Sequence, residues 1–228
     1  LSAAEKANML FIVQDPYTSY YDAKVVRDFV ALTQKLGFSP ILLPFKPNGK
    51  AMHIKGFLAR FSKTAKTQAE FLNRVAKLNV PLVGVDPAIV LSYRDEYKEA
   101  LGDSRGDFHV LTAHEWLTNQ LDCNTLQSAV KNIAKSDCTF EWHLFPHCTE
   151  STFMPNSPKE WQHIFAQFGQ TLNVEKVGCC GMAGVFGHEV QNQTMSKDIY
   201  DVSWGKKLQG KDPNHCLATG YSCRSQVK

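Results

Sequence analysis

Met9-Leu10-Phe11-Ile12-Val13-Gln14 is the stretch that decides the fold, because a short apolar run of this kind is typical of a buried β-strand. Asp22 then provides a candidate helix N-cap. The residues after it are apolar at helical spacing: Val25, Val26, Phe29, Val30 and Leu36. Gly37 ends this helix, and Ile41-Leu42-Leu43 forms the next strand. A strand, a helix and a second strand in this order predict a parallel α/β sheet.

The rest of the chain alternates between strands and helices in the same way. In the first half we expect helices at 52–61 and 67–78, a strand at 80–85, and a helix that begins at Asp86-Pro87. In the second half we expect strands at 140–145, 174–178 and 216–219, with helices at 158–172 and 189–208. A short strand and two helices between Phe108 and Lys135 would join the halves. The second half therefore repeats the plan of the first.

A fixed spacing between strand ends indicates that the two halves arose by duplication. Pro44 precedes Asp86 by 42 positions, and Gly178 precedes Gly220 by the same 42. The offset between the halves is 134 at both places. The sequence thus predicts an α/β fold of two tandem Rossmann-like parallel-sheet halves related by internal duplication. Their expected bounds are 1–107 and 140–228, with a connecting segment at 108–139.

The composition limits the classes of protein to which the chain can belong. A 43% hydrophobic and 21% charged composition is ordinary for a soluble globular protein. A net charge of +3 gives no basic field for nucleic acid, and no apolar run reaches the ~20 residues that span a bilayer. The first residues lack the basic-then-apolar pattern of a signal peptide. Because the chain has no initiator Met and stops soon after a new helix begins, we expect it to be a piece of a longer polypeptide.

Four cysteines from three separate segments are the strongest signal of chemistry. Gly178-Cys179-Cys180-Gly181 places two soft ligands side by side, while Cys148 lies upstream and Cys223 downstream. Each segment follows a predicted strand, and the carboxyl ends of parallel strands line one edge of a sheet. The four thiols therefore predict a metal site, either tetrahedral zinc or an iron–sulfur cluster. A redox dithiol at Cys179 and Cys180 is the metal-free alternative, and simple burial as small apolar residues is the non-functional one.

The remaining cysteines and the nearby histidines have simpler interpretations. Cys123 and Cys138 do not belong to the repeat, and Cys216 precedes its strand, so all three are interpreted as packing residues. His147 and His188 flank the cysteine segments and can donate to a cluster sulfur or ligate a metal, although a loop histidine bonded to water or backbone is the commoner case. An odd count of seven cysteines, two of them adjacent, favours a reducing, cytoplasmic location.

Polar residues near the strand ends of the first half are interpreted as helix caps and surface ion pairs: Asp15, Asp86, Arg94, Asp95 and Glu96. Lys46, Asn48 and Lys50 around Gly49 can bind an anion, but they form no complete phosphate-binding loop. This half contains no cysteine at all. If the duplication is real, one cysteine site therefore survives and its twin has been lost.

The motif made by Cys148, the run from Gly178 to Gly184, and Cys223 resembles the cysteine-rich CCG domain. That domain occurs in the cysteine-rich subunit of heterodisulfide reductase and in the iron–sulfur subunits of glycolate oxidase and anaerobic glycerol-3-phosphate dehydrogenase. Four further segments extend the resemblance over nearly the whole chain: Val13 to Asp22, Gly84 to Ala88, Pro146 to Glu150, and Ala218 to Gln226. They resemble large bacterial FAD-linked oxidoreductases, which fuse a flavin dehydrogenase for D-2-hydroxy acids to a ferredoxin-like segment and this domain.

The resemblance implies a carboxyl-terminal iron–sulfur electron-transfer domain of a FAD-linked D-2-hydroxy-acid dehydrogenase, of the 2-hydroxyglutarate or lactate/glycolate type. Cys148, Cys179, Cys180 and Cys223 would hold a 4Fe-4S cluster, or zinc if the domain is instead a structural docking module. FAD and substrate would bind upstream, so the isolated chain would lack dehydrogenase activity. Its partners would be the flavin domain of the same polypeptide and an electron acceptor, either a quinone or a redox protein. Through that acceptor, a cytoplasmic domain would associate with a membrane.

Two departures from the family pattern affect the site. The first repeat has Phe45, Lys46 and Ile89 where the second has Cys179, Cys180 and Cys223, so at most one of the family's two sites remains. In the second repeat, Gly220 occupies the first position of the expected Cys-x-x-Cys. Heterodisulfide reductase builds its noncubane clusters on the full five-cysteine set. We therefore expect an ordinary four-iron cluster or a zinc ion here.

Overall fold

The computed structural model describes residues 2–122, 126–134 and 140–228. These residues form two compact units, 1–129 and 130–228, and each unit is described by itself. The connecting segment predicted at 108–139 is divided between them. Cys123 and Cys138, predicted to be packing residues, lie outside the described residues. Among the described residues, no helix combines the length and the apolar composition that a membrane crossing requires.

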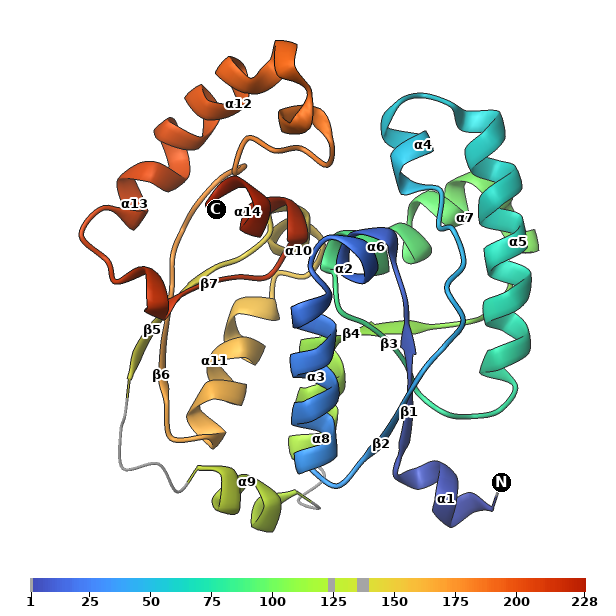
Figure 1. Ribbon diagram of the computed structural model, residues 1–228. Helices are drawn as coiled ribbons and strands as arrows, with labels where there is room; N and C mark the ends of the chain where they lie inside the picture. Colours follow the sequence, from blue (N-terminus) through green and yellow to red (C-terminus); the bar gives the residue numbers. More distant parts are fainter. Residues whose placement is uncertain (1, 123–125, 135–139) are drawn as a thin grey trace. The chain divides into compact units, whose positions relative to one another are not determined.

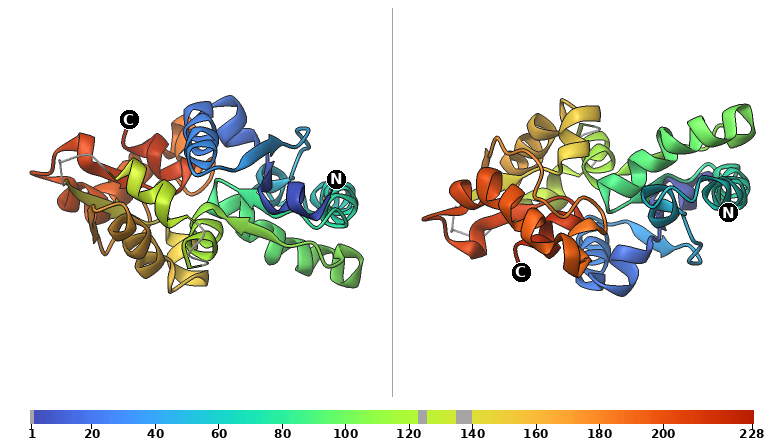
Figure 2. Two further views of the ribbon diagram at one scale, coloured as in Figure 1. Left: turned by 90° about the horizontal axis from the view of Figure 1, so that it is seen from below. Right: turned by 90° about the horizontal axis from the view of Figure 1, so that it is seen from above.

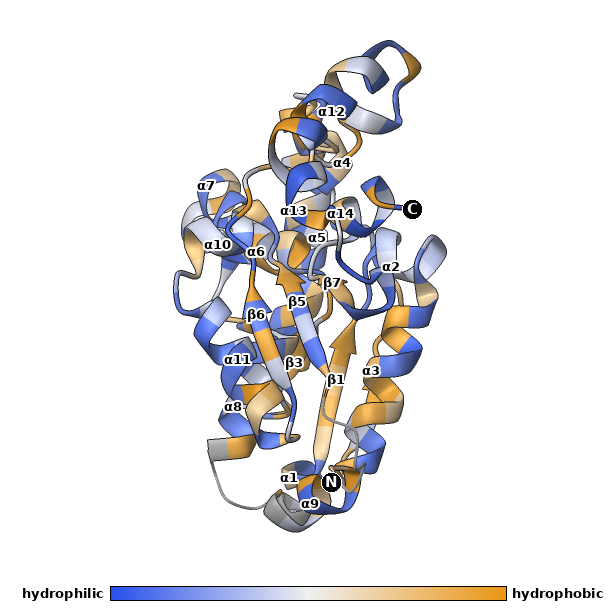
Figure 3. Ribbon diagram, turned by 90° about the vertical axis from the view of Figure 1, so that its left-hand side faces the viewer, coloured by the Kyte–Doolittle hydropathy of each residue, from blue (hydrophilic) through white to orange (hydrophobic). Residues whose placement is uncertain are grey.

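The first unit is built on a parallel sheet of four strands in the order β2-β1-β3-β4. The strands are β1 (Met9–Val13), β2 (Ser39–Leu42), β3 (Leu82–Gly84) and β4 (Val110–Thr112). Met9 of β1 pairs with Ser39 of β2, and Phe11 pairs with Leu82 of β3. Strand β1 is hydrophobic along its length (Figure 3), and four of its five residues are buried. The predicted opening strand is therefore one of the two central strands of this sheet.

Helices cover both faces of this sheet. They are α1 (Ala3–Ala7), α2 (Pro16–Tyr20), α3 (Ala23–Lys35), α4 (Lys50–Ile54), α5 (Leu58–Ala76), α6 (Pro87–Arg94), α7 (Glu96–Leu101), a 3-10 turn (Gly102–Arg105) and α8 (Ala113–Asp122); α9 (Gln127–Ile133) follows. Phe29 of α3 packs edge-on against Trp116 of α8, with ring centroids 6.0 Å apart. Phe61 of α5 packs in the same way against Tyr97 of α7, at 5.7 Å. The strands stand between α3 and α5 in Figure 1 and in the two views of Figure 2.

The second unit contains a parallel sheet of three strands in the order β6-β5-β7. The strands are β5 (Glu141–Phe145), β6 (Thr171–Val174) and β7 (Cys216–Ala218). The helical segments are α10 (Cys148–Phe153), α11 (Ser157–Gln167), two 3-10 turns (Phe186–His188 and Val190–Asn192), α12 (Gln193–Tyr200), a π-helical turn (Asp201–Gly205), α13 (Lys206–Leu208), a further 3-10 turn (Pro213–His215) and α14 (Tyr221–Gln226). Both sheets thus place their first strand between their second and third, which supports the predicted duplication of Rossmann-like halves.

One strand of the second unit lies earlier than the sequence predicts. The expected helix 158–172 ends at Gln167, because Gly169 adopts a left-handed backbone with φ +69°. The strand then occupies Thr171–Val174 instead of 174–178, so four residues separate its end from the paired cysteines. The offset between the halves changes accordingly. Counted between the first residues of corresponding strands, the offset is 132 from Met9 to Glu141 and also 132 from Ser39 to Thr171. It is 134 only between the third strands, from Leu82 to Cys216.

The central strand β5 carries apolar contacts on both faces, because side chains alternate along a strand. Trp142 packs against Phe165 of α11, with ring centroids 6.3 Å apart. Phe145 projects from the opposite face and packs against Trp204 of the π-helical turn, at 5.1 Å. The sheet therefore supports α11 on one side and the segment from α12 to α13 on the other.

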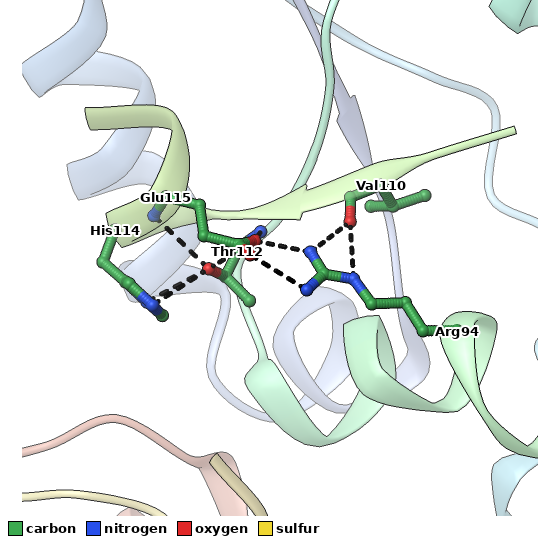
Figure 4. Close-up of polar contacts among 5 residues, drawn as sticks. All are labelled: Arg94, Val110, Thr112, His114 and Glu115. Carbon is green, nitrogen blue, oxygen red and sulfur yellow. Dashed lines mark hydrogen bonds and ion pairs between the residues drawn. The ribbon is translucent and has the colours of Figure 1, made fainter. Parts of the chain in front are cut away.

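Arg94 ties the end of α6 to β4 and α8 in the first unit. Figure 4 shows its guanidinium between the Val110 carbonyl and the Glu115 carboxylate. The Nη1 and Nη2 atoms of Arg94 donate to Glu115 over 2.9 and 2.5 Å, and Nη2 donates to the Val110 oxygen over 2.7 Å. Burial raises the pKa of Glu115, but bonds from Arg94 and from the Thr112 N–H lower it more, so the pKa of this carboxyl lies below its ordinary value.

Replacing Arg94 tests how much this ion pair stabilises the first unit. Arg94→Met should lower the free energy of unfolding by about 2 kcal/mol, because Glu115 would keep its charge in a largely buried place without its partner. Urea unfolding at pH 7 measures the change. Lys24→Met, which removes the partner of Asp28 from an exposed pair, should cost less than about 0.5 kcal/mol. Equal losses of unfolding free energy in the two variants would show that the Arg94–Glu115 pair stabilises the unit no more than an exposed pair does.

Candidate metal centre

The four predicted cysteines lie on three segments that leave the carboxyl ends of the second sheet's strands. Cys148 is the first residue of α10, after β5. Cys179 and Cys180 lie in the loop after β6, and Cys223 lies in the first turn of α14, after β7. Because the three strands are parallel, their carboxyl ends meet at one edge, where α10 and α14 lie in Figure 1.

The segment from α12 to α13 fixes the cysteine loop by direct backbone contacts. Trp204 Nε1 donates to the Gly178 carbonyl over 3.1 Å, and the Gly178 N–H donates to Ser203 Oγ over 2.7 Å. Gly181 has φ +92°, and a Cβ atom there would lie 2.0 Å from the carbonyl oxygen of Ser196. Gly181 is therefore required both by its backbone conformation and by the close approach of the helix.

The structure brings the four thiols together. The Cys148 and Cys180 thiols both interact with the Cys179 sulfur, and Cys180 also interacts with Cys223. The neighbouring Cys148 and Cys180 thiols lower the pKa of Cys179, while Cys179 is the largest cause that raises the pKa of Cys148 and of Cys180. All four cysteines are free of disulfides. Residues 148 and 223, 75 positions apart in the chain, are close enough for their charges to interact.

Backbone donors and an apolar cover surround these sulfurs. The Gly181 N–H donates to Cys179 Sγ over 3.3 Å, and the Ala183 N–H also acts on this sulfur. Cys180 and Cys223 are 3% and 1% exposed, and they belong to an apolar cluster with Phe145, Met182 and Trp204. Cys148 and Cys179 are more exposed. The site is therefore shielded from solvent at Cys180 and Cys223 and accessible to solvent at Cys148 and Cys179.

The donor set fits a thiophilic metal, although the side chains do not surround a single point. Within 2–122, 126–134 and 140–228, no group of three or more His, Cys, Asp or Glu has the arrangement that would hold a metal ion directly. The thiols act on one another electrostatically, from Cys148 through Cys179 and Cys180 to Cys223. Four thiols with backbone N–H donors are the chemistry that zinc and iron–sulfur centres use. Binding either one would require the thiols to lose their protons and turn inward.

The other residues singled out in this half have structural contacts. Cys216 lies on β7 at the margin of the apolar cluster, which agrees with its predicted packing role. The backbone N–H of His147 donates to Thr219 Oγ1 over 2.9 Å, and His147 Nδ1 accepts from the Thr149 N–H over 3.2 Å. The His188 ring stacks on Tyr221, with centroids 6.4 Å apart.

The polar residues of the first half act largely as predicted. Asp15 and Asp86 cap α2 and α6 through bonds from backbone N–H groups. Arg94 and Glu96 form ion pairs, with Glu115 and Lys50, although these pairs are more buried than the surface pairs expected. Asp95 makes no side-chain cap bond to α7. The candidate anion set is engaged elsewhere, because Lys50 pairs with Glu96 and Lys46 lies 5.6 Å above the Phe71 ring.

Sequence reasoning missed the residues that hold the cysteine loop. Ser196, Ser203 and Trp204 contact it from a helical segment about twenty residues further along the chain. Glu150 was also missed, although it is fully buried and accepts bonds from Ser157, Trp161 and Thr219. The sequence signal for this contact was Trp204 in a helical segment. The spacing of residues does not reveal that Trp204 binds the Gly178 carbonyl.

The fold and the site together define a class: an α/β protein with two parallel sheets and a four-thiol group at the edge of one. The chain is 82% identical, over all 228 residues, to part of D-2-hydroxyglutarate dehydrogenase from Haemophilus influenzae. It is 57% identical over the same length to the Escherichia coli K12 protein of that name. The chain spans 22% of the length of each of these relatives.

A more distant similarity connects the chain to a second kind of dehydrogenase. One of the subunits of anaerobic glycerol-3-phosphate dehydrogenase from Escherichia coli K12 is 26% identical over 194 residues, which is 80% of this chain and 46% of that protein. No protein-family model matches the chain.

Substitution of Gly181 tests whether the close approach of the helix holds the cysteine loop. Gly181→Ala should lower the free energy of unfolding by more than about 3 kcal/mol, since it combines a left-handed backbone with a clash against Ser196. Gly210→Ala is the matched control, because Gly210 has φ +79° and no atom within 4 Å of the added Cβ. It should cost only about 1–2 kcal/mol. Urea unfolding of both variants gives the comparison, and similar losses would show that the contact contributes nothing.

Proposed function

We propose that this chain is the iron–sulfur electron-transfer domain of a FAD-linked D-2-hydroxy-acid dehydrogenase, of the cysteine-rich CCG type. Cys148, Cys179, Cys180 and Cys223 would ligate a single 4Fe-4S cluster. The convergence of these four thiols at the edge of the second sheet is the observation that carries the proposal.

The similar proteins support the redox part of this proposal. Relatives that are similar over the full chain are named D-2-hydroxyglutarate dehydrogenase, and a more distant one belongs to a glycerol-3-phosphate dehydrogenase. Both names describe oxidation of a secondary alcohol, which releases two electrons. A bound iron–sulfur cluster supplies one-electron transfer, so that electrons from a two-electron donor leave singly.

The chain's own residues would hold and shield such a cluster. The Gly181 and Ala183 N–H groups, which already act on the Cys179 sulfur, would stabilise negative charge on the ligands. Met182 and Trp204 would exclude water from the buried side, around Cys180 and Cys223. The more exposed side, at Cys148 and Cys179, would face the electron partner.

The partners and location follow from the same proposal. The flavin domain of the longer polypeptide would deliver electrons, and a quinone or a redox protein would receive them. D-2-hydroxyglutarate is the substrate that the names of the relatives favour, and it would bind outside this chain. The chain alone would therefore not oxidise it. We place the protein in the cytoplasm, where thiols stay reduced.

A structural zinc site is the second candidate, and the four-thiol donor set favours it as well. In that case the domain would dock onto its flavin partner without carrying electrons. The two candidates differ in metal content, because only the cluster contains inorganic sulfide.

Metal and sulfide analysis of protein purified without oxygen tests the proposal. We expect about four iron and four sulfide per chain, with the broad visible absorbance of a thiolate-bound cluster. About one zinc per chain without sulfide would establish the second candidate instead. Failure to hold either metal, even after anaerobic reconstitution with iron and sulfide or with zinc, would contradict the proposed site.

Single Cys→Ser variants identify the ligands. Replacement of Cys148, Cys179, Cys180 or Cys223 should lower the iron content at least about tenfold, because each removes one of the four thiols that contact one another. Cys216→Ser is the matched control, since Cys216 lies on β7 outside the thiol group and should leave the iron content unchanged. Equal iron in Cys223→Ser and Cys216→Ser would remove Cys223 from the ligand set.

A further inference from the structure

Two buried carboxylates lie side by side in the first unit. Asp15 and Asp86 follow the ends of the neighbouring parallel strands β1 and β3, each by two residues. Each side chain caps a helix: Asp15 Oδ1 accepts from the Tyr17 and Thr18 N–H groups over 2.8 and 2.9 Å, and Asp86 Oδ1 accepts from residues 88 and 89 over 3.0 and 3.2 Å. Both aspartates are only 2% exposed. The capping bonds explain why each is present, but not why two like charges share one buried place.

The electrostatic environment of Asp15 is unfavourable to its negative charge. Burial and the neighbouring charge of Asp86 raise the pKa of Asp15 to about 6. Among the described residues, Asp15 has no Lys, Arg or His partner, and its polar contacts are the Thr18 hydroxyl and the two backbone donors. A buried negative charge held beside a like charge disfavours folding. A positive charge beside Asp15 would therefore stabilise the first unit.

Three uncharged polar side chains converge on the same place. Gln68 from α5, Asn48 before α4, and Tyr93 from α6 are 2%, 2% and 0% exposed. Within the described part of the chain, Gln68 Oε1, Asn48 Nδ2 and the Tyr93 hydroxyl have no hydrogen-bond partner. Tyr93 lies within reach of the charge of Asp15, and the amides of Gln68 and Asn48 act on its hydroxyl. These three groups nevertheless do not meet in hydrogen-bond geometry. Each buried polar atom left without a partner costs about 1–3 kcal/mol, so an occupant is expected among them.

We propose that one divalent, oxygen-coordinated cation binds between Asp15, Asp86, Gln68 and Tyr93, with water completing its coordination. Two carboxylates balance the charge of a divalent ion, and carboxylate, amide and hydroxyl oxygens are the donors that Ca²⁺ and Mg²⁺ prefer. Asn48 Nδ2 cannot ligate a cation. It would donate to one of the bound waters, which gives this atom the partner it lacks.

The position of the site in the fold supports this assignment. Asp15 and Asp86 stand two residues beyond the first and third strands of their sheet, and His147 and Gly220 stand at the same places in the second unit. There Cys148 follows His147 directly, and Cys223 lies three residues after Gly220. Each unit would thus use the same edge of its own sheet for a different kind of metal, soft at the thiols and hard at the carboxylates.

Thermal unfolding of chelator-treated protein tests the proposal. We expect CaCl₂ or MgCl₂, added up to 10 mM at constant ionic strength, to raise the melting temperature in a saturable manner by about 5 °C or more. Titration calorimetry should give one ion per chain. An unchanged melting temperature with both salts would overturn the proposal and leave a buried water as the occupant.

Variants locate the ion. Asp86→Asn keeps an N-cap oxygen and the size of the side chain, so it should fold but lose the response to the cation. Asp28→Asn makes the same change on an exposed residue of the same unit and should keep the full response. Cys179→Ser should also keep it, because the thiol group belongs to the other unit. A full response in Asp86→Asn, or a lost response in Cys179→Ser, would show that the ion binds elsewhere.

Discussion

The parallel pairing of β5 with β6 and β7 is the constraint on which the cysteine site depends. Parallel strands end at the same edge of a sheet, so loops that are distant in sequence start close together. Cys148 and Cys223 are brought within reach of the Cys179–Cys180 pair by this pairing and not by local sequence. The contacts of Gly178 with Ser203 and Trp204 then determine the path of the intervening loop.

Much of the fold was predictable because the strands are short apolar runs between clear helix signals. The run at Met9, the caps at Asp15 and Asp86, and the alternation of strands with helices follow from local composition. The prediction failed at β6, where Val174 to Gly178 looked like a strand. Pairing with β5 selects Thr171–Val174 instead, and only the partner strand carries that information.

The proximity of the four cysteines was predictable because each segment that carries them follows a parallel strand, whereas the buried group in the first unit was not recognised. Asp15 and Asp86 each look like an ordinary cap in sequence, and their spacing says nothing of their proximity. Gln68 and Tyr93 look like residues of amphipathic helices. Their convergence depends on how α5 and α6 pack on the sheet, which no local pattern encodes.

The contact between His147 and Gly220 restricts how this site can change over time. A Cβ atom at residue 220 would lie 2.3 Å from the His147 ring, so no larger side chain fits there while the histidine keeps its place. A cysteine at 220, the position at which the family pattern has its additional thiol, would therefore require His147 to move or to be replaced first. The two positions are coupled, and a chain that carries this pair cannot gain a fifth sulfur at 220 by a single substitution without distorting the sheet edge.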